Sequence, residues 1–203
     1  MTEGKGKRTG KPRARAGARA GKGESAARAR RAASRDDAER VRIGVVDTTF
    51  ARINMGDVAL ATNADEAPDA ELGRVTVPGV KDLPAACRMM LDAGCDAVLA
   101  CGWIGPETID KTCGHEASLG LMQLRVMFGR PLLEVFVHED EAPLRRSRKG
   151  PDHDVKTLAY VARERTREHA LNACWMLLDP ERLIRMAGTG QRQGFEDAGP
   201  LED

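Results

Sequence analysis

The stretch KTCGHEASLG, residues 111–120, places a thiol, an imidazole and a carboxylate within four positions. These groups belong to Cys113, His115 and Glu116, and a second polar stretch, HED, follows at residues 138–140. Such side chains can bind a metal ion or transfer protons. Zinc-binding helices carry their ligands on one face, whereas adjacent helical residues point about 100° apart. The spacing therefore argues against a metal centre and leaves acid–base chemistry or an ordinary helix surface as the alternatives.

Lys111, His115 and Ser118 are spaced at i, i+4 and i+7, so a helix places them on one face. This arrangement indicates the polar side of a pocket, although a histidine on a helix surface is an equally simple interpretation. The motifs of other site classes are absent from the sequence. It contains no GxSxG turn for a hydrolytic serine, and no GxGxxG or Walker loop for phosphate groups.

The elements that must position these groups follow from the apolar pattern. Four runs rich in apolar and β-branched residues predict buried strands at 42–47, 73–77, 95–103 and 131–137. The remaining segments predict helices at 83–91, 111–128 and 155–178, with a short helix and an acidic loop between 52 and 71. Alternating strands and helices indicate an α/β domain with a parallel sheet covered on both faces.

Two helices carry further signals. Asp82 is expected to cap the helix at 83–91, with Pro84 in its first turn. The apolar residues of the helix at 111–128 recur at helical spacing as Leu119, Met122 and Val126. In parallel α/β folds the ligand lies beyond the carboxyl ends of the strands. This rule selects the loops at 47–52, 78–84, 102–116 and 138–142, where Phe50 is placed to stack on a flat ligand.

Charge divides the chain into two parts. Residues 1–40 hold 13 Lys and Arg against 5 Asp and Glu, a net charge of +8, and the remaining residues hold 19 against 26, a net charge of −7. The first 40 residues contain no Val, Ile, Leu, Phe, Trp, Tyr or Cys, so they cannot form a core. We therefore predict a disordered basic tail at 1–40 and a folded domain at 41–203. The tail is interpreted as a solubilising extension or as a weak, non-specific ligand of polyanions.

The cellular context is read from the cysteines and the apolar runs. The five cysteines form no CxxC pair and lie in apolar segments, which indicates reduced, buried thiols in a cytoplasmic protein. The sequence shows neither a run of membrane-spanning length nor the pattern of a secretory signal. A membrane partner is not expected.

Several long segments carry a family resemblance: VDTTF, TVPGVKDLPAAC, DKTCGHEASLGLM, EVFVHEDEA and RMAGTGQRQGFEDAGP. Together they resemble the archaeal riboflavin synthase family, which is related to lumazine synthase, from about residue 42 to residue 200. The resemblance implies a three-layer flavodoxin-like (lumazine synthase-like) domain with a four-stranded parallel sheet. It also implies a homopentamer with active sites at the subunit interfaces.

The activity implied by the resemblance is a dismutation. Two molecules of 6,7-dimethyl-8-(D-ribityl)lumazine exchange a four-carbon unit and give riboflavin and 5-amino-6-(D-ribitylamino)uracil. Such enzymes need no organic cofactor, and a divalent ion such as Mg²⁺ is a requirement that some of them have. The expected catalytic residues are His115, Glu116 and Lys111. The expected substrate-binding residues are Thr49, Phe50, Pro78, Gly79, Val80, Lys81, Asp82, Asp110, Glu134, His138 and Glu139.

Two alternatives remain beside this interpretation. A lumazine synthase would join the pyrimidine diamine to a four-carbon phosphate, which requires a phosphate site that the acid-rich stretch HEDEA serves poorly. A non-catalytic scaffold tethered to nucleic acid by its tail is the second alternative, although the net charge of −7 beyond residue 40 opposes contact between the domain and nucleic acid. The glycine-rich segment 186–200 is expected to dock on a neighbouring subunit.

Overall fold

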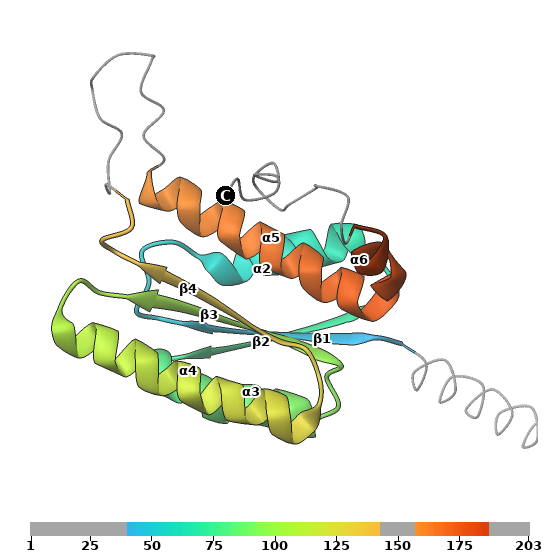
Figure 1. Ribbon diagram of the computed structural model, residues 1–203, viewed down its shortest axis with the longest axis horizontal. Coiled ribbons are helices and arrows are strands. Elements are labelled where there is room, and N and C mark those ends of the chain that lie inside the picture. The colour runs from blue at the N-terminus through green and yellow to red at the C-terminus, as the bar shows by residue number, and fades with distance from the viewer. Residues whose placement is uncertain (1–39, 143–156, 187–203) are drawn as a thin grey trace, which may run out of the picture. The chain divides into compact units, whose positions relative to one another are not determined.

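A parallel sheet forms the centre of the computed structural model, which describes residues 40–142 and 157–186 (Figure 1). Its strand order is β2-β1-β3-β4. The strands are β1 (Arg42–Thr48), β2 (Glu71–Val77), β3 (Ala97–Ile104) and β4 (Leu132–His138). The four-stranded parallel sheet predicted from the sequence is thereby confirmed.

Helices cover both faces of the sheet (Figure 1). One face packs against α2 (Met55–Glu66) and α5 (Leu158–Leu178), and the other packs against α3 (Leu83–Asp92) and α4 (Thr108–Phe128). Two short helices complete the described elements, the 3-10 helix η1 (Val80–Asp82) and α6 (Pro180–Met186).

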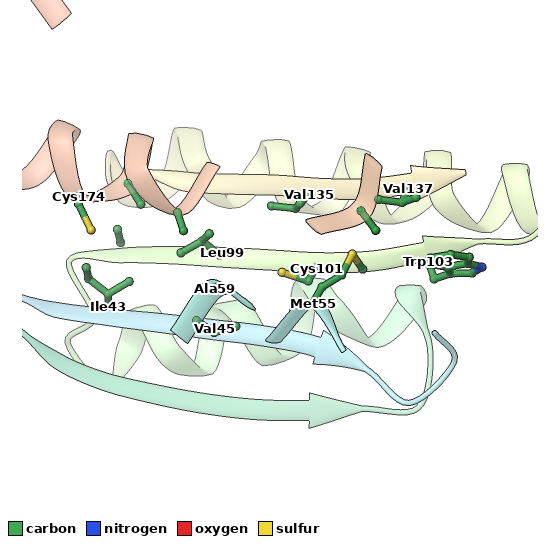
Figure 2. Packing of buried hydrophobic residues seen from close by; sticks show 14 of the residues in the cluster. Ile43, Val45, Met55, Ala59, Leu99, Cys101, Trp103, Val135, Val137 and Cys174 are labelled. Carbon is green, nitrogen blue, oxygen red and sulfur yellow. The ribbon is translucent and has the colours of Figure 1, made fainter. Parts of the chain in front are cut away.

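Alternation along the strands produces two cores, one on each face of the sheet. Successive strand side chains point to opposite faces, so neighbours in β3 separate: Leu99 joins the core under α2 and α5, and Val98 joins the core under α3 and α4. Figure 2 shows the first of these cores, in which residues from three strands meet α2 and α5. All eight residues of β3 are buried, as expected for a central parallel strand.

The carboxyl ends of the strands lie at one edge because their registers coincide. The last residue of β1, Thr48, pairs with Val77 at the end of β2, and Ile104 at the end of β3 pairs with His138 at the end of β4. The four loops selected from the sequence therefore leave the sheet along the same edge. This edge is where the candidate site is found.

Helix boundaries have local causes. Asn54 caps α2, where its side-chain oxygen accepts a hydrogen bond of 3.1 Å from the backbone N–H of Asp57. The hydroxyl of Thr157 does the same for Tyr160 at the start of α5. Gly129 ends α4 in the left-handed conformation, with φ of 59°, which glycine adopts without strain.

One sequence prediction about burial was wrong. The run at 73–77 belongs to β2, an edge strand with a neighbouring strand on one side only, and the strand is only partly buried. The helix at 111–128 is present, and the apolar residues whose spacing indicated it, Leu119, Met122 and Val126, are exposed. The residues that face the sheet are instead Gly114, Ala117, Leu121 and Leu124.

Close packing explains the orientation of α4. A Cβ atom added to Gly114 would stand 2.8 Å from Cδ1 of Ile104, so the glycine lets the helix lie this near to β3 without a shift of the Ile104 side chain. The small face of the helix therefore turns inward and its larger apolar side chains turn outward.

Some predictions fall on residues outside the described ranges. The tail at 1–40 is described only at Arg40, the segment 186–200 only at Met186, and the predicted helix start at 155 not at all. These remain predictions, as does the domain boundary between residues 40 and 41. Among the described helices, none is both long enough and apolar enough to cross a membrane.

Candidate active site

The loop after β1 is tied to the loop after β2. The backbone N–H of Thr49 donates to the carbonyl of Val77 at 2.8 Å, and its hydroxyl donates to the carbonyl of Pro78 at 3.1 Å. The N–H of Phe50 also reaches the Pro78 carbonyl, at 3.3 Å. These bonds hold the phenyl ring of Phe50, which is 55% exposed, beside the turn that begins at Gly79.

The turn after β2 forms η1. Its Asp82 carboxylate accepts the backbone N–H of Gly79 at 3.3 Å, which closes the turn on itself. Asp82 is the N-cap residue of α3 and Pro84 lies in the first turn, as predicted, but the Asp82 side chain is directed back to Gly79 and makes no capping hydrogen bond to α3. Val80 and Lys81 project from this turn into the same region as Phe50.

The loop after β3 brings Asp110 into place. Asp110 lies in the first turn of α4, and its carboxylate packs against the backbone of Gly105, where an added Cβ atom would overlap it. One turn further along α4, the thiol-bearing residue Cys113 is partly exposed. Both residues face the space bordered by Phe50 and Val80.

These loops enclose a pocket of about 230 Å³. Its lining is more apolar than polar and includes five of the predicted site residues: Phe50, Gly79, Val80, Lys81 and Asp110. The sequence analysis missed the other four lining residues, namely Trp103, Ile104, Gly105 and Cys113. Their position at the end of β3 was a usable signal, since the strand-end rule had already selected the segment 102–116.

Two ion pairs tie α4 to neighbouring loops, and Lys81 of the first pair lines the pocket. Lys81 pairs with Glu116 across from η1 to α4, and Lys111 Nζ lies 2.6 Å from the Asp140 carboxylate after β4. The hydrogen bond that Lys81 donates to Glu116 raises the pKa of Lys81, and the hydrogen bond that Lys111 donates to Asp140 lowers the pKa of Asp140. Two of the predicted catalytic residues, Lys111 and Glu116, are thus engaged in ion pairs and do not line the pocket.

Glu139 connects three strand ends. Its Oε1 accepts hydrogen bonds from the indole N–H of Trp103 and from Nε of Arg52, both at 2.8 Å, and only 12% of its side chain is exposed. Its backbone N–H donates to the carbonyl of Ile104 at 2.9 Å. Glu139 was predicted as a substrate-binding residue, and the structure shows this oxygen used to hold the loop that carries Arg52 against β3.

The polar face predicted on α4 runs along β4. Ser118 donates to Glu134 at 2.8 Å, and Lys111 reaches Asp140 further along the same strand direction. His115 lies between them on this face and is exposed. Because β4 is an edge strand, this face of α4 stands at an open side of the sheet.

Glu134 and His138 do not line the pocket described above. Glu134 lines a different cavity of about 510 Å³, which it shares with Arg125, Arg130 and His169 at the other end of the sheet. His138 is partly buried at the end of β4, where its backbone N–H donates to Glu141. The structure therefore does not gather every predicted residue around one cavity within a single chain.

The thiols divide into two groups. Cys87, Cys95, Cys101 and Cys174 are free and buried, as predicted, whereas Cys113 is not buried and lines the pocket. Burial raises the pKa of Cys87 to about 12 and that of Cys174 to about 11. Within the described part of the chain, no three His, Cys, Asp or Glu side chains are grouped so that they could hold a metal ion.

Comparison with known proteins places this arrangement in a family context. A family model described as 6,7-dimethyl-8-ribityllumazine synthase matches residues 40–178. A riboflavin synthase of Methanothermobacter marburgensis is 46% identical over 162 residues, which are 79% of this chain and 99% of that protein. A riboflavin synthase of Archaeoglobus fulgidus is 42% identical over 162 residues, with the same two shares.

A more distant similarity concerns the second enzyme type. A 6,7-dimethyl-8-ribityllumazine synthase of Bdellovibrio bacteriovorus is 32% identical over 92 residues, which are 43% of this chain and 50% of that protein. The riboflavin synthases are thus matched over almost their whole length, and this lumazine synthase over half of its length.

Proposed function

The chain belongs to the 6,7-dimethyl-8-ribityllumazine synthase family, in its archaeal riboflavin synthase branch, and from this membership we propose that it dismutates two molecules of 6,7-dimethyl-8-(D-ribityl)lumazine. One molecule donates a four-carbon unit to the other, and the products are riboflavin and 5-amino-6-(D-ribitylamino)uracil. The observation that carries the proposal is the 42–46% identity to riboflavin synthases along nearly their full length.

The size of the pocket supports a site shared between subunits. Pockets for small molecules usually measure about 300–1,000 Å³, and the pocket behind Phe50 measures about 230 Å³. This pocket therefore offers too little enclosed space for two ring systems. We place the second half of the site on a neighbouring chain.

The outer face of α4 supports assembly as a homopentamer. Leu119, Met122 and Val126 form an apolar stripe, the α4 stripe, on the side of the helix that turns away from the sheet. Their exposed fractions are 43%, 52% and 82%. Contiguous exposed apolar surface on a folded domain commonly marks a contact with another chain.

Substrate binding is assigned to the loops that meet at the pocket. The exposed ring of Phe50 stacks on one lumazine ring, and the polar groups of Gly79, Val80 and Lys81 meet a ribityl chain. Thr49, Pro78 and Asp82 act indirectly, because their hydrogen bonds hold these two loops together. Orientation of two bound rings can itself lower a barrier by about 7–11 kcal/mol.

Of the remaining predicted residues, Lys111 and His115 lie on the open side of the sheet, and Glu116 is directed to η1, where it pairs with Lys81. His115, Glu116 and Lys111 are proposed as proton-handling and charge-stabilising groups that act where a neighbouring chain completes the site. Glu134 and His138 lie along the same β4 edge and are proposed as contacts of that shared part. Glu139 contributes by holding Arg52 and Trp103.

No organic cofactor is required by the proposed reaction, since both the donor and the acceptor of the four-carbon unit are lumazine molecules. The described residues of one chain form no cluster of His, Cys, Asp or Glu suited to a resident metal ion. No step of the proposed reaction is assigned to a metal ion, and the dependence on Mg²⁺ is left to the experiment below.

The direct test is to incubate the purified full chain with 6,7-dimethyl-8-(D-ribityl)lumazine (lumazine below) as the sole substrate, with and without Mg²⁺. The products are quantified by chromatography. We expect riboflavin and the pyrimidine in equal amounts. If riboflavin is absent, but lumazine forms from the pyrimidine diamine and the four-carbon phosphate, the protein is a lumazine synthase and the proposal fails.

The tail is proposed to bind polyanions weakly and to play no part in catalysis. Removal of residues 1–40, which carry a net charge of +8, should leave turnover unchanged and weaken retention on heparin. Loss of turnover in this variant would show that the tail is needed for catalysis. A full-length chain without turnover, but with tight RNA or DNA binding, would favour the scaffold alternative.

A further inference from the structure

We propose that Asp110 is the catalytic base that removes a proton from the C7 methyl group of the bound lumazine. The proposal rests on the function proposed above, which supplies the substrate. It assigns the chemistry to a residue that was expected only to bind the substrate.

The first argument is the position of the carboxylate. Asp110 lines the pocket together with Phe50, Val80 and Cys113, so a ring stacked on Phe50 lies within reach of it. Among the described residues, no hydrogen bond or ion pair engages the Asp110 carboxylate. Its lone pairs are therefore available to a ligand.

The second argument is that neighbouring carboxylates are occupied. Glu116 pairs with Lys81, Asp140 with Lys111, and Asp82 with the N–H of Gly79. Glu139 holds Trp103 and Arg52. A base must be free to accept a proton, and of these carboxylates only that of Asp110 both lines the pocket and lacks such a partner.

The third argument is the close contact between Asp110 and Gly105. A Cβ atom on Gly105 would overlap Oδ2 of Asp110 and stand 2.8 Å from its Cγ. Glycine at position 105 therefore lets the carboxylate occupy this place in the pocket wall. Any larger residue would displace the carboxylate without removing it.

The step is a simple proton transfer. A C–H bond of the C7 methyl group breaks, an O–H bond forms on the Asp110 carboxylate, and the electron pair passes into the lumazine ring as an exocyclic methylene anion. Charge is conserved, because the negative charge moves from the carboxylate to the ring. This anion is the nucleophile that the proposed dismutation needs.

The test compares Asp110→Asn with Glu107→Gln, a matched control. Glu107 precedes the same helix, carries the same charge and does not line the pocket. We expect Asp110→Asn to lower kcat by about 10²–10⁴-fold while lumazine still binds, and Glu107→Gln to keep wild-type turnover. Binding is followed by the fluorescence of lumazine itself.

Three further readouts separate catalysis from structure. Lumazine deuterated at the C7 methyl group should show a larger kinetic isotope effect on kcat in the Asp110→Asn enzyme than in the wild type. Asp110→Glu should recover part of the rate, and Gly105→Ala should lower kcat although Asp110 is retained. If Asp110→Asn does not fold, the last two variants still decide the question.

The outcomes distinguish this inference from the proposed function. A wild-type chain that makes no riboflavin overturns the proposed function. A wild-type chain that makes riboflavin, with Asp110→Asn within about threefold of its kcat and with an unchanged isotope effect, overturns the role of Asp110 alone.

Discussion

Cys113 differs from the other four cysteines because it borders the pocket, whereas they lie in the two cores. A thiol reacts as its thiolate, and burial suppresses that form by raising the pKa, as it does for Cys87 and Cys174. Chemical reactivity should therefore separate Cys113 from the other four cysteines. At the scale of single residues, exposure to solvent decides which thiol can react with an added reagent.

We predict that a maleimide at pH 7 labels one thiol per native chain and all five after denaturation. Cys113→Ser should abolish native labelling, whereas Cys174→Ser should retain it. Lumazine should slow the reaction, because the thiol lines the proposed site. Mass spectrometry identifies the labelled residue, and rapid labelling of Cys87 or Cys101 would contradict the prediction.

A second prediction concerns the ion pair of Glu141 and Arg165. Burial by itself raises the pKa of Glu141, but the hydrogen bonds from Arg165 and from the N–H of His138 outweigh it and place the pKa below its ordinary value of 4.5. The pair therefore stabilises the folded state above pH 4.5, and this contribution is lost as the pH falls through the lower folded-state pKa.

Glu141→Gln should accordingly lower the Tm at pH 7 by roughly 2–4 °C, which corresponds to a contribution of up to about 1 kcal/mol. The wild-type and variant melting curves should converge in acid below pH 4.5. Differential scanning calorimetry across this range tests the sign. A Tm difference that grows in acid would contradict it.

At the scale of elements, the site is built from loops whose anchors lie in the sheet. Glu139 is the clearest of these anchors, since one oxygen holds both Arg52 from the loop after β1 and Trp103 from the end of β3. These two hydrogen bonds, the Glu139 clamp, fix the segment that carries Phe50 relative to β3. Loss of these hydrogen bonds should weaken substrate binding more than it lowers the stability of the fold.

We predict that Glu139→Ala raises the KM for lumazine and shifts the emission of Trp103, whose N–H loses its acceptor. Leaving a buried N–H unpaired costs about 1–3 kcal/mol. Glu139→Gln keeps a carbonyl acceptor and should have a smaller effect. Both are measured in a Trp175→Phe background, because Trp175 lies on α5 against Glu66 and would otherwise add its own emission. Unchanged emission in Glu139→Ala would contradict the clamp.

At the scale of the whole molecule, two surfaces of one chain are not covered by other described parts of that chain. The α4 stripe is exposed and apolar, and the edge of β4 has no neighbouring strand among the described residues. Each apolar side chain covered in an assembly contributes about 1.5–3 kcal/mol. These surfaces and the small pocket all favour an oligomer in which neighbouring chains complete the sites.

We predict that Val126→Glu converts the assembly to monomers at micromolar concentration and removes most of the turnover, because a charge would be buried at the interface. Ile184→Glu is the control, since Ile184 is 73% exposed but lies on α6. Analytical ultracentrifugation gives the mass of each species. A Val126→Glu protein that keeps the wild-type mass would show that the α4 stripe is not the interface.

Local pattern was sufficient for most of the fold. Apolar strand runs and helix signals predicted all four described strands, and the helices α3, α4 and α5 within a few residues, because backbone hydrogen bonding and burial act over short stretches. Local pattern also selected the four loops of the site, since parallel strands must end at one edge. Phe50 was found in this way before any contact was known, whereas the rule gave only the segments that contain Lys81 and Asp110, and the family resemblance singled out these two residues.

Contacts between distant residues were decided only by the tertiary structure. The period of α4 is visible in the sequence, but which side faces the sheet depended on the fit of Gly114 against Ile104, so Leu119, Met122 and Val126 turned outward. In the same way, the sequence by itself supplied the titratable groups, and only folding determined their partners. Pairing of Glu116 with Lys81, across 35 residues, and the free carboxylate of Asp110 depend on where chain segments meet in space. The periodicity of the sequence carries no information about which distant segments meet.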